Sequence, residues 1–192
     1  MNQKIKDEIL TVPNLLSLFR ILLIPIFVWL YMSQEDYFYA ALIVVLSGIT
    51  DILDGFIARR FNLITRLGKV LDPIADKLTQ AVVLLCLIDR FPLMALPFIL
   101  LVIKEVVTGI GGLLAIQKSG NVHGSDWHGK VSTALLYVLM VVHLLWFNIP
   151  TDISNLFILA SVIMMIISFS LYTYQNIQVI QEADNKQKEE RE

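Results

Sequence analysis

The chain has 192 residues, of which 56% are hydrophobic and 17% are charged, and its formal net charge is −2. A soluble domain of this length is less apolar, so these figures exclude an ordinary soluble globular protein and indicate an integral membrane protein with one helical domain. Nothing in the composition predicts a nucleic-acid partner, and a single cysteine excludes an intrachain disulfide.

The first 12 residues are mostly polar and charged. Ile5, Ile9 and Val12 recur at helical spacing among them, which predicts a short amphipathic helix over residues 1–12 lying on the membrane surface. No small-residue cleavage site follows the first apolar run, so we expect that run to stay as a membrane anchor.

Six apolar segments follow, each close to the roughly 20 residues that a membrane-spanning helix needs. They lie near residues 14–33, 37–60, 69–89, 92–117, 129–148 and 151–178. The sequence therefore predicts an all-α membrane protein, with six transmembrane helices in one domain spanning residues 13–180. We expect the charged residues 181–192 to be a polar cytoplasmic tail at the frayed end of the last helix.

Four aspartates stand in the second and third of these segments, where each charge placed in a membrane costs about 2.5–3.5 kcal/mol. Asp51 and Asp54 are three residues apart, and Asp72 and Asp76 are four apart, so each pair lies on one face of its helix. The connection between the two helices is long enough for the chain to reverse. We therefore expect the two pairs to face each other.

Carboxylates that meet in this way suit hard divalent cations, Mg²⁺ or Mn²⁺. Two such ions would balance the four negative charges, which is the simplest way to make the cluster tolerable in a membrane. Packing gives no reason for such a cluster, so the sequence predicts a metal-dependent function here.

Lysine and arginine residues gather at one side of the predicted topology, at both chain ends and around the second and fourth connections. These residues are Lys4, Lys6, Arg59, Arg60, Arg66, Lys69, Lys118, Lys130, Lys186, Lys188 and Arg191. Arg90 falls on the opposite side. By the positive-inside rule, we expect a multi-pass protein of the cell membrane with both termini and the acidic site at the cytoplasmic face.

The acids belong to a longer pattern, Asp51-x2-Asp54-Gly55-x2-Ala58-Arg59-x8-Gly68-x3-Asp72-x3-Asp76. It resembles the signature of the CDP-alcohol phosphotransferase family at every specified position, and the six-helix layout resembles that family over nearly the whole chain. Flanking residues are similar to one branch, the bacterial synthases that make phosphatidylglycerophosphate. The flanking features are Val12-Pro13-Asn14-Leu15 with Arg20, Leu71-Asp72-Pro73, Ala75-Asp76-Lys77, Lys104-Glu105, and Gly129-Lys130 before Thr133.

The resemblance implies a reaction in which a CDP-linked lipid gives its phosphatidyl group to an alcohol and releases CMP. For this branch the lipid is CDP-diacylglycerol and the alcohol is sn-glycerol 3-phosphate. The resemblance also implies that the protein is a homodimer and that membrane lipids surround it. It makes Asp51, Asp54 and Asp72 the main metal ligands, and it makes Asp76 the base that takes the proton of the attacking hydroxyl while also serving as a ligand.

The family resemblance places the CDP-lipid against Gly55, Ala58, Arg59 and Gly68. Arg59 is always charged and forked, which suits a diphosphate. For the small residues the alternative is close packing of helices. Because these small residues lie beside four acids, we favour nucleotide binding.

Candidates for binding the acceptor phosphate are Arg66, Lys104, Lys130 and Arg20. The alternatives are a loop charge that sets topology for Arg66, snorkelling for Lys130, and headgroup contact for Arg20. Lys104 lies inside an apolar helix, where a charge normally faces the bundle interior and has a partner. Asn14 is expected to cap the first helix, and the family resemblance also allows it to contact the catalytic helices.

Other interpretations of the acids remain. The same reaction with another acceptor would make cardiolipin, phosphatidylinositol phosphate or phosphatidylserine, because the aspartate pattern is common to all of these enzymes. A divalent-cation transporter would use the acids as a permeation site, and a membrane scaffold would leave them unexplained. We expect His123, Asp126 and His128 to belong to a polar loop, because their spacing matches no established zinc pattern.

Overall fold

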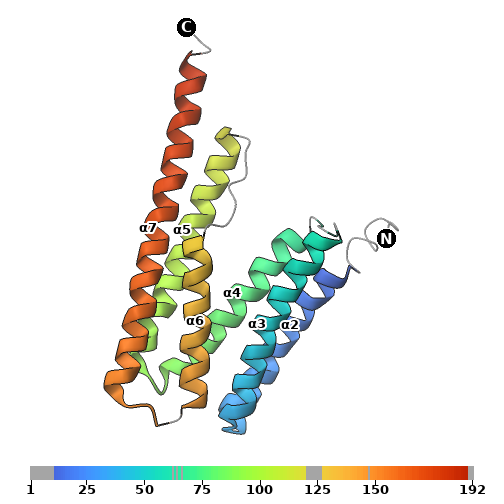
Figure 1. The fold of residues 1–192 in the computed structure, drawn as a ribbon, viewed down its shortest axis with the longest axis vertical. Helices are drawn as coiled ribbons and strands as arrows, with labels where there is room; N and C mark the ends of the chain where they lie inside the picture. The colour runs from blue at the N-terminus through green and yellow to red at the C-terminus, as the bar shows by residue number, and fades with distance from the viewer. Residues whose placement is uncertain are drawn as a thin grey trace. The chain divides into compact units, whose positions relative to one another are not determined.

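The structure, a computed structural model, describes residues 11–61, 63, 65, 67–119, 127–146 and 148–189. Within these residues all regular structure is helical (Figure 1). The α-helices are α2 (Val12–Val28), α3 (Tyr37–Arg60), α4 (Gly68–Ile88), α5 (Ala95–Ser119), α6 (Trp127–Leu145) and α7 (Thr151–Glu189). A π-helical turn, η1 (Trp29–Ser33), extends α2, and a 3-10 turn, η2 (Pro92–Met94), leads into α5.

Each of the six predicted segments is helical in the structure. The start of α3 has a local cause, because the side chain of Asp36 accepts a hydrogen bond of 3.2 Å from the backbone N–H of Tyr39. The polar tail is helical as well, since α7 continues to Glu189. Its Glu, Gln and Lys residues are good helix formers and need no apolar partner. The amphipathic helix predicted over residues 1–12 lies outside the described residues, apart from the last two.

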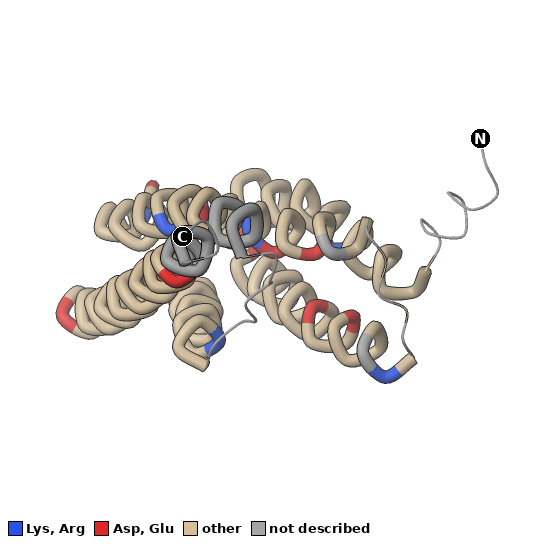
Figure 2. Tube along the Cα trace, turned by 90° about the horizontal axis from the view of Figure 1, so that it is seen from above, with Lys and Arg blue, Asp and Glu red and all other residues tan. Residues whose placement is uncertain are grey.

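Among the described residues, five stretches of helix are long and apolar enough to cross a membrane. They are Val12–Ser33, Tyr37–Ala58, Pro92–Gly112, Trp127–Leu145 and Thr151–Glu182. Most of the helix length carries neither acidic nor basic residues (Figure 2), and many large apolar side chains are exposed, such as Leu22 at 64% and Ile52 at 70%. These features are those of a multi-pass membrane protein.

The third predicted span, residues 69–89, coincides with α4, but α4 is not among the five apolar stretches. Its N-terminal half contains Lys69, Asp72, Asp76 and Lys77, which lower its hydropathy below that of a plain lipid-facing helix. The helix is therefore confirmed where we expect it, whereas its crossing of the membrane stays a prediction.

The described helices belong to two compact units. Unit 1 comprises Met1–Met94 and Tyr137–Pro150, and unit 2 comprises Ala95–Leu136 and Thr151–Glu192. The boundary divides α6 just before Tyr137. In unit 2, α5 packs along α7.

In unit 1, α2 packs against both α3 and α4, while α3 and α4 share few contacts. One end of this three-helix group has an apolar core. Its members include Leu23, Phe27, Ala40, Ala41, Val44, Val83, Leu84 and Leu87. The other end is polar and equally buried. Its members are Asn14, Ser17, Arg20, Ser47, Thr50, Asp54, Asp76, Thr79 and Gln80. A buried polar layer of this kind is costly unless its groups are paired, and it holds the candidate site.

Candidate active site

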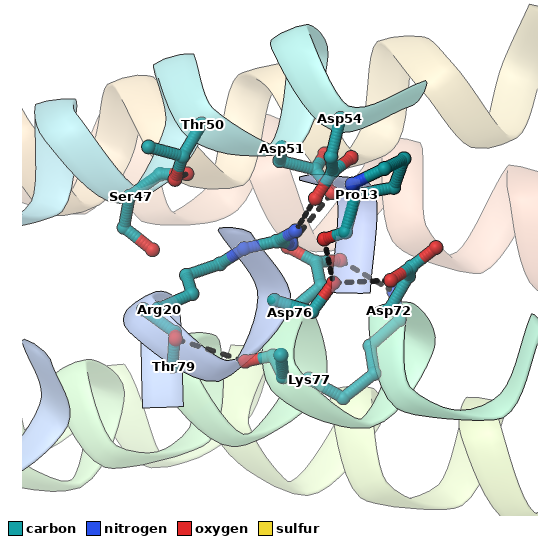
Figure 3. Close-up of polar contacts among 12 residues, drawn as sticks. Pro13, Arg20, Ser47, Thr50, Asp51, Asp54, Asp72, Asp76, Lys77 and Thr79 are labelled. Carbon is teal, nitrogen blue, oxygen red and sulfur yellow. Dashed lines mark hydrogen bonds and ion pairs between the residues drawn. The ribbon is translucent and has the colours of Figure 1, made fainter. Parts of the chain in front are cut away.

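The two aspartates of α3 are bound by one arginine of α2 (Figure 3). Arg20 Nη1 lies 2.6 Å from Asp51 Oδ1, and Arg20 Nη2 donates to Asp54 Oδ2. The Arg20 side chain has no exposed surface, and Asp54 is 2% exposed. A guanidinium has several donors in a fixed fork, so it can hold two carboxylates at once. The charge of the α3 pair is therefore partly compensated within the chain.

The two aspartates of α4 are held by uncharged donors. Ser17 of α2 donates to Asp72 Oδ1. Asp76 accepts hydrogen bonds from Tyr137 Oη to Oδ1 at 2.8 Å and from Gln80 Nε2 to Oδ2 at 2.9 Å. Lys77 Nζ is farther from Asp76 Oδ2, at 3.7 Å.

The structure brings the four carboxyl groups to one place. Figure 3 shows Asp51 and Asp54 above, and Asp72 and Asp76 below, around the end of the Arg20 side chain. They are close enough for their charges to interact across the two helices, Asp51 with Asp76 and Asp54 with Asp72. The spacing of the acids along the chain and the packing of both helices on α2 together produce this cluster.

Each helix contributes one accessible and one buried acid. Asp51 has 38% of its side chain exposed and Asp72 is half-buried, whereas Asp54 and Asp76 are buried. A ligand that approaches the cluster therefore meets Asp51 and Asp72 first, with the buried acids behind them.

The donor set suits a hard divalent cation, because it consists of carboxylate oxygens. In the arrangement described, however, no group of three or more His, Cys, Asp or Glu side chains among the described residues is placed to hold a metal ion. Arg20 contacts Oδ1 of Asp51 and Oδ2 of Asp54, one oxygen of each carboxylate. The residues thus fit a metal chemically, and a metal at the α3 pair would have to bind beside the guanidinium of Arg20.

Asn14 does not cap the first helix, contrary to expectation. Helix α2 begins at Val12, two residues earlier, and Asn14 is fully buried within it. Its Oδ1 accepts a hydrogen bond of 3.1 Å from Thr65 Oγ1, which in turn accepts the backbone N–H of Gly68 at 2.9 Å. Asn14 therefore helps to fix the start of α4.

Gly68 has a packing reason of its own. A Cβ at this position would lie 2.6 Å from Asn14 Oδ1, closer than real contacts allow, and 3.0 Å from Thr65 Oγ1, which is unusually tight. The atoms close to Gly68 are those of α2 and of the connection before α4, which accounts for the glycine by packing, and its contact with the CDP-lipid stays a prediction.

The other candidate residues for the CDP-lipid are on α3. Gly55 and Ala58 are half-buried there, one to four residues beyond Asp54. The side chain of Arg59 lies outside what the structure describes, and so does Arg66. Their roles stay predictions.

The lysine candidates belong to unit 2. Lys104 is buried within α5, at 8% exposed, and Lys130 is exposed in the first turn of α6. His128 is wrongly predicted as a loop residue. It is part of α6 and buried, with its ring edge-on to that of Tyr172 at 4.6 Å between centroids. His123 and Asp126 lie outside the described residues.

Three residues that contact the acids are missed by the sequence reasoning. Ser17 and Gln80 carry a signal that could reveal them, because Ser17 lies one turn from Arg20 and Gln80 one turn from Asp76 on the same helix. Tyr137 carries none, since it is 61 residues from Asp76 and is one of several tyrosines in apolar helices.

Comparison with known proteins gives consistent matches. The CDP-alcohol phosphatidyltransferase family matches residues 10–173. Similar proteins include the CDP-diacylglycerol–glycerol-3-phosphate 3-phosphatidyltransferase of Aquifex aeolicus, 30% identical over 177 residues, which are 89% of this chain and 98% of the relative. The protein of that name from Escherichia coli K12 is 36% identical over 70% of this chain and 76% of the relative. The protein of that name from Rickettsia typhi is 38% identical over 55% of this chain and 61% of the relative.

Proposed function

The chain belongs to the CDP-alcohol phosphatidyltransferase family, and we propose that it transfers the phosphatidyl group of CDP-diacylglycerol to sn-glycerol 3-phosphate. The products are phosphatidylglycerophosphate and CMP. Transferase activity on CDP-diacylglycerol-type lipids follows from the family. The choice of acceptor rests on the similar proteins that bear this activity in their names. The observation that carries the site assignment is the convergence of four aspartates on one place (Figure 3).

In the proposed step, the acceptor hydroxyl oxygen attacks the phosphorus on the lipid side of the diphosphate. A new P–O bond forms, the P–O bond to CMP breaks, and CMP leaves with the bonding electrons. The hydroxyl proton goes to Asp76, the proposed base. Help of this kind is typically worth about 10²–10⁴-fold in rate. The hydrogen bonds from Tyr137 and Gln80 hold this carboxylate at the site.

The family is metal-dependent, and Asp51, Asp54 and Asp72 are the residues that would hold the ions, with Asp76 as a further ligand. Two Mg²⁺ or Mn²⁺ ions would offset negative charge on the diphosphate and the leaving CMP. Ser17 fixes the orientation of Asp72, and Arg20 fixes that of Asp51 and Asp54.

The remaining candidate residues complete the proposed site. Gly55, Ala58, Arg59 and Gly68 would bind the CDP-lipid, and the acceptor phosphate would bind basic side chains. The basic candidates are Arg66, Lys104, Lys130 and Arg20, the last of which would have to turn its guanidinium away from Asp51 and Asp54. A homodimer in the cell membrane, with the acids and both termini at the cytoplasmic face, is part of the same proposal.

A divalent-cation transporter receives less support than the transferase. Arg20 is a fixed cation that contacts both acids of α3 and has no exposed surface. The family match over residues 10–173 is to transferases, which favours catalysis over cation permeation.

The proposal is tested with the full-length protein in detergent, Mg²⁺, CDP-diacylglycerol and a panel of acceptors. The panel contains sn-glycerol 3-phosphate, inositol phosphate, serine and phosphatidylglycerol, and CMP and the lipid product are both measured. We expect CMP release with sn-glycerol 3-phosphate and loss of release with EDTA. Release with another acceptor alone would show that the acceptor is wrong. No release with any of them would overturn the transferase assignment.

A further inference from the structure

In the contacts that the structure describes, Asp76 is the acid of the cluster whose two carboxylate oxygens are bound by side chains from two different helices. Tyr137 of α6 donates to Oδ1 at 2.8 Å, and Gln80 of α4 donates to Oδ2 at 2.9 Å. All three residues belong to unit 1. The 61 residues between Tyr137 and Asp76 make this a tertiary contact, not a consequence of local helix geometry.

The ring of Tyr137 rests on a glycine of a third helix. A Cβ placed on Gly48 of α3 would lie 3.5 Å from Tyr137 Cε1 and 3.6 Å from Cδ1, which is ordinary van der Waals contact. The ring therefore lies directly over the backbone of α3 while its hydroxyl reaches Asp76 on α4. Anything much larger than a methyl group at Gly48 would push the ring away, so this glycine keeps the position of the hydroxyl.

Gln80 supplies the second support. Its side chain is fully buried one turn beyond Asp76 on α4. Its Oε1 has no hydrogen-bond partner among the described residues, so its amide interacts with Asp76 through the NH₂ group.

Two neutral donors can fix the orientation of a catalytic base without neutralising its charge, as a cation would. An aspartate carboxylate rotates freely about its last bond unless its oxygens are held. It has about four lone-pair positions, so two hydrogen bonds fix the plane of the group and leave others open to accept a proton. Neutral donors also leave the negative charge of the carboxylate in place, and Lys77 Nζ, at 3.7 Å from Oδ2, is farther than either donor. A base must lie within about 2.6–3.2 Å of the hydroxyl it serves, so a fixed plane matters for the rate.

We infer that Tyr137 is a positioning residue for the transfer step, acting through Asp76, with Gln80 as its partner on the other carboxylate oxygen. The inference rests on the proposed role of Asp76 as the base. Tyr137 touches no substrate in this assignment, so its removal should slow turnover without weakening substrate binding.

The test is steady-state kinetics of Tyr137→Phe, which removes the hydroxyl and keeps the ring on Gly48. We expect kcat to fall about 10- to 100-fold, with KM for both substrates within about threefold of wild type. Gln80→Met should give the same pattern. Tyr31→Phe is the matched control, because Tyr31 is a buried tyrosine of unit 1 whose ring contacts are Phe27 and Tyr37. Its kcat and KM should match wild type.

Three results would overturn the inference. They are an unchanged kcat in Tyr137→Phe, a rise in KM that accounts for the whole loss, and a fall in kcat matched by an equal loss of correctly folded protein in thermal unfolding. Failure of the acceptor assignment is separate, because it appears in the wild-type enzyme. If the wild-type enzyme uses another alcohol, the kcat and KM of each variant are compared with those of wild type using that alcohol.

Discussion

The two pairs of aspartates point to the same place but differ in the groups that hold them. On α3, Asp51 and Asp54 share the guanidinium of Arg20, a buried cation. On α4, Asp72 and Asp76 are held by hydroxyl and amide donors from Ser17, Tyr137 and Gln80. The α3 pair thus has a countercharge built into the chain, whereas the α4 pair has mainly its orientation fixed.

The difference shows what α2 contributes to the site. Ser17 reaches α4 and Arg20 reaches α3, and the two residues are one turn apart on α2. Since α3 and α4 share few contacts with each other, α2 is the common support that sets the spacing between the pairs. A buried charge that loses its partner is far more costly than a hydrogen bond that is replaced by water. The two pairs should therefore respond differently to substitution.

Exchanging one acid in each pair gives the largest expected effect. We expect Asp76→Asn to lower kcat by about 10²–10⁴-fold while affinity for CDP changes less than about threefold. Asp51→Asn should instead weaken CDP binding, because it removes a proposed metal ligand. Calorimetric titration with CDP in Mg²⁺ and the CMP-release rate measure the two properties. An equal loss of CDP affinity in both variants would assign Asp76 a metal or structural role only.

Removing the cation of the α3 pair comes next. We expect Arg20→Met to lower the free energy of unfolding by about 3–5 kcal/mol, because the buried Asp54 loses its ion pair. Arg20→Lys keeps the charge, so its free energy of unfolding should lie between those of wild type and Arg20→Met. Thermal unfolding in detergent with EDTA measures the loss, and added Mg²⁺ should stabilise Arg20→Met more than it stabilises wild type. A variant as stable as wild type would show that the pairing is not needed.

Removing the hydroxyl that holds Asp72 has a smaller expected effect. Ser17 Oγ has one hydrogen and two acceptors nearby, Asp72 and the carbonyl of Pro13 at 3.1 Å. Hydrogen bonds to charged groups contribute about 1.5–3 kcal/mol when buried, and Asp72 is half-buried, so water replaces part of the loss. We expect Ser17→Ala to lower kcat/KM about tenfold and Ser17→Thr to retain activity. An inactive Ser17→Thr would indicate that side-chain size, and not the hydroxyl, matters.

The smallest expected effect is at Lys77. Its Nζ lies 3.7 Å from Asp76 Oδ2, and its side chain is 28% exposed. Pairs of this kind contribute about 0–1 kcal/mol, so we expect Lys77→Met to keep kcat/KM within about threefold of wild type. The CMP-release assay measures it. A fall in kcat/KM as large as that of Ser17→Ala would mean that the α4 pair also depends on a countercharge.

The sequence alone determined the helices and the composition of the acid cluster. Apolar runs of about 20 residues require helices in a membrane, because every backbone group must be paired there. The spacing of Asp51 with Asp54, and of Asp72 with Asp76, places each pair on one helical face. These are local properties, governed by a repeat of about 3.6 residues, so they can be read from neighbouring positions.

Tertiary packing alone decided which groups hold the acids. Arg20 pairs with Asp51 across 31 residues, Ser17 meets Asp72 across 55, and Tyr137 meets Asp76 across 61. No local pattern encodes which faces of α2, α3, α4 and α6 meet. For the same reason, the position of Asn14 after Pro13 predicts a helix cap, whereas in the structure Asn14 lies within α2 and supports the start of α4. Contacts between distant segments depend on how whole helices pack, and one-dimensional spacing does not contain that information.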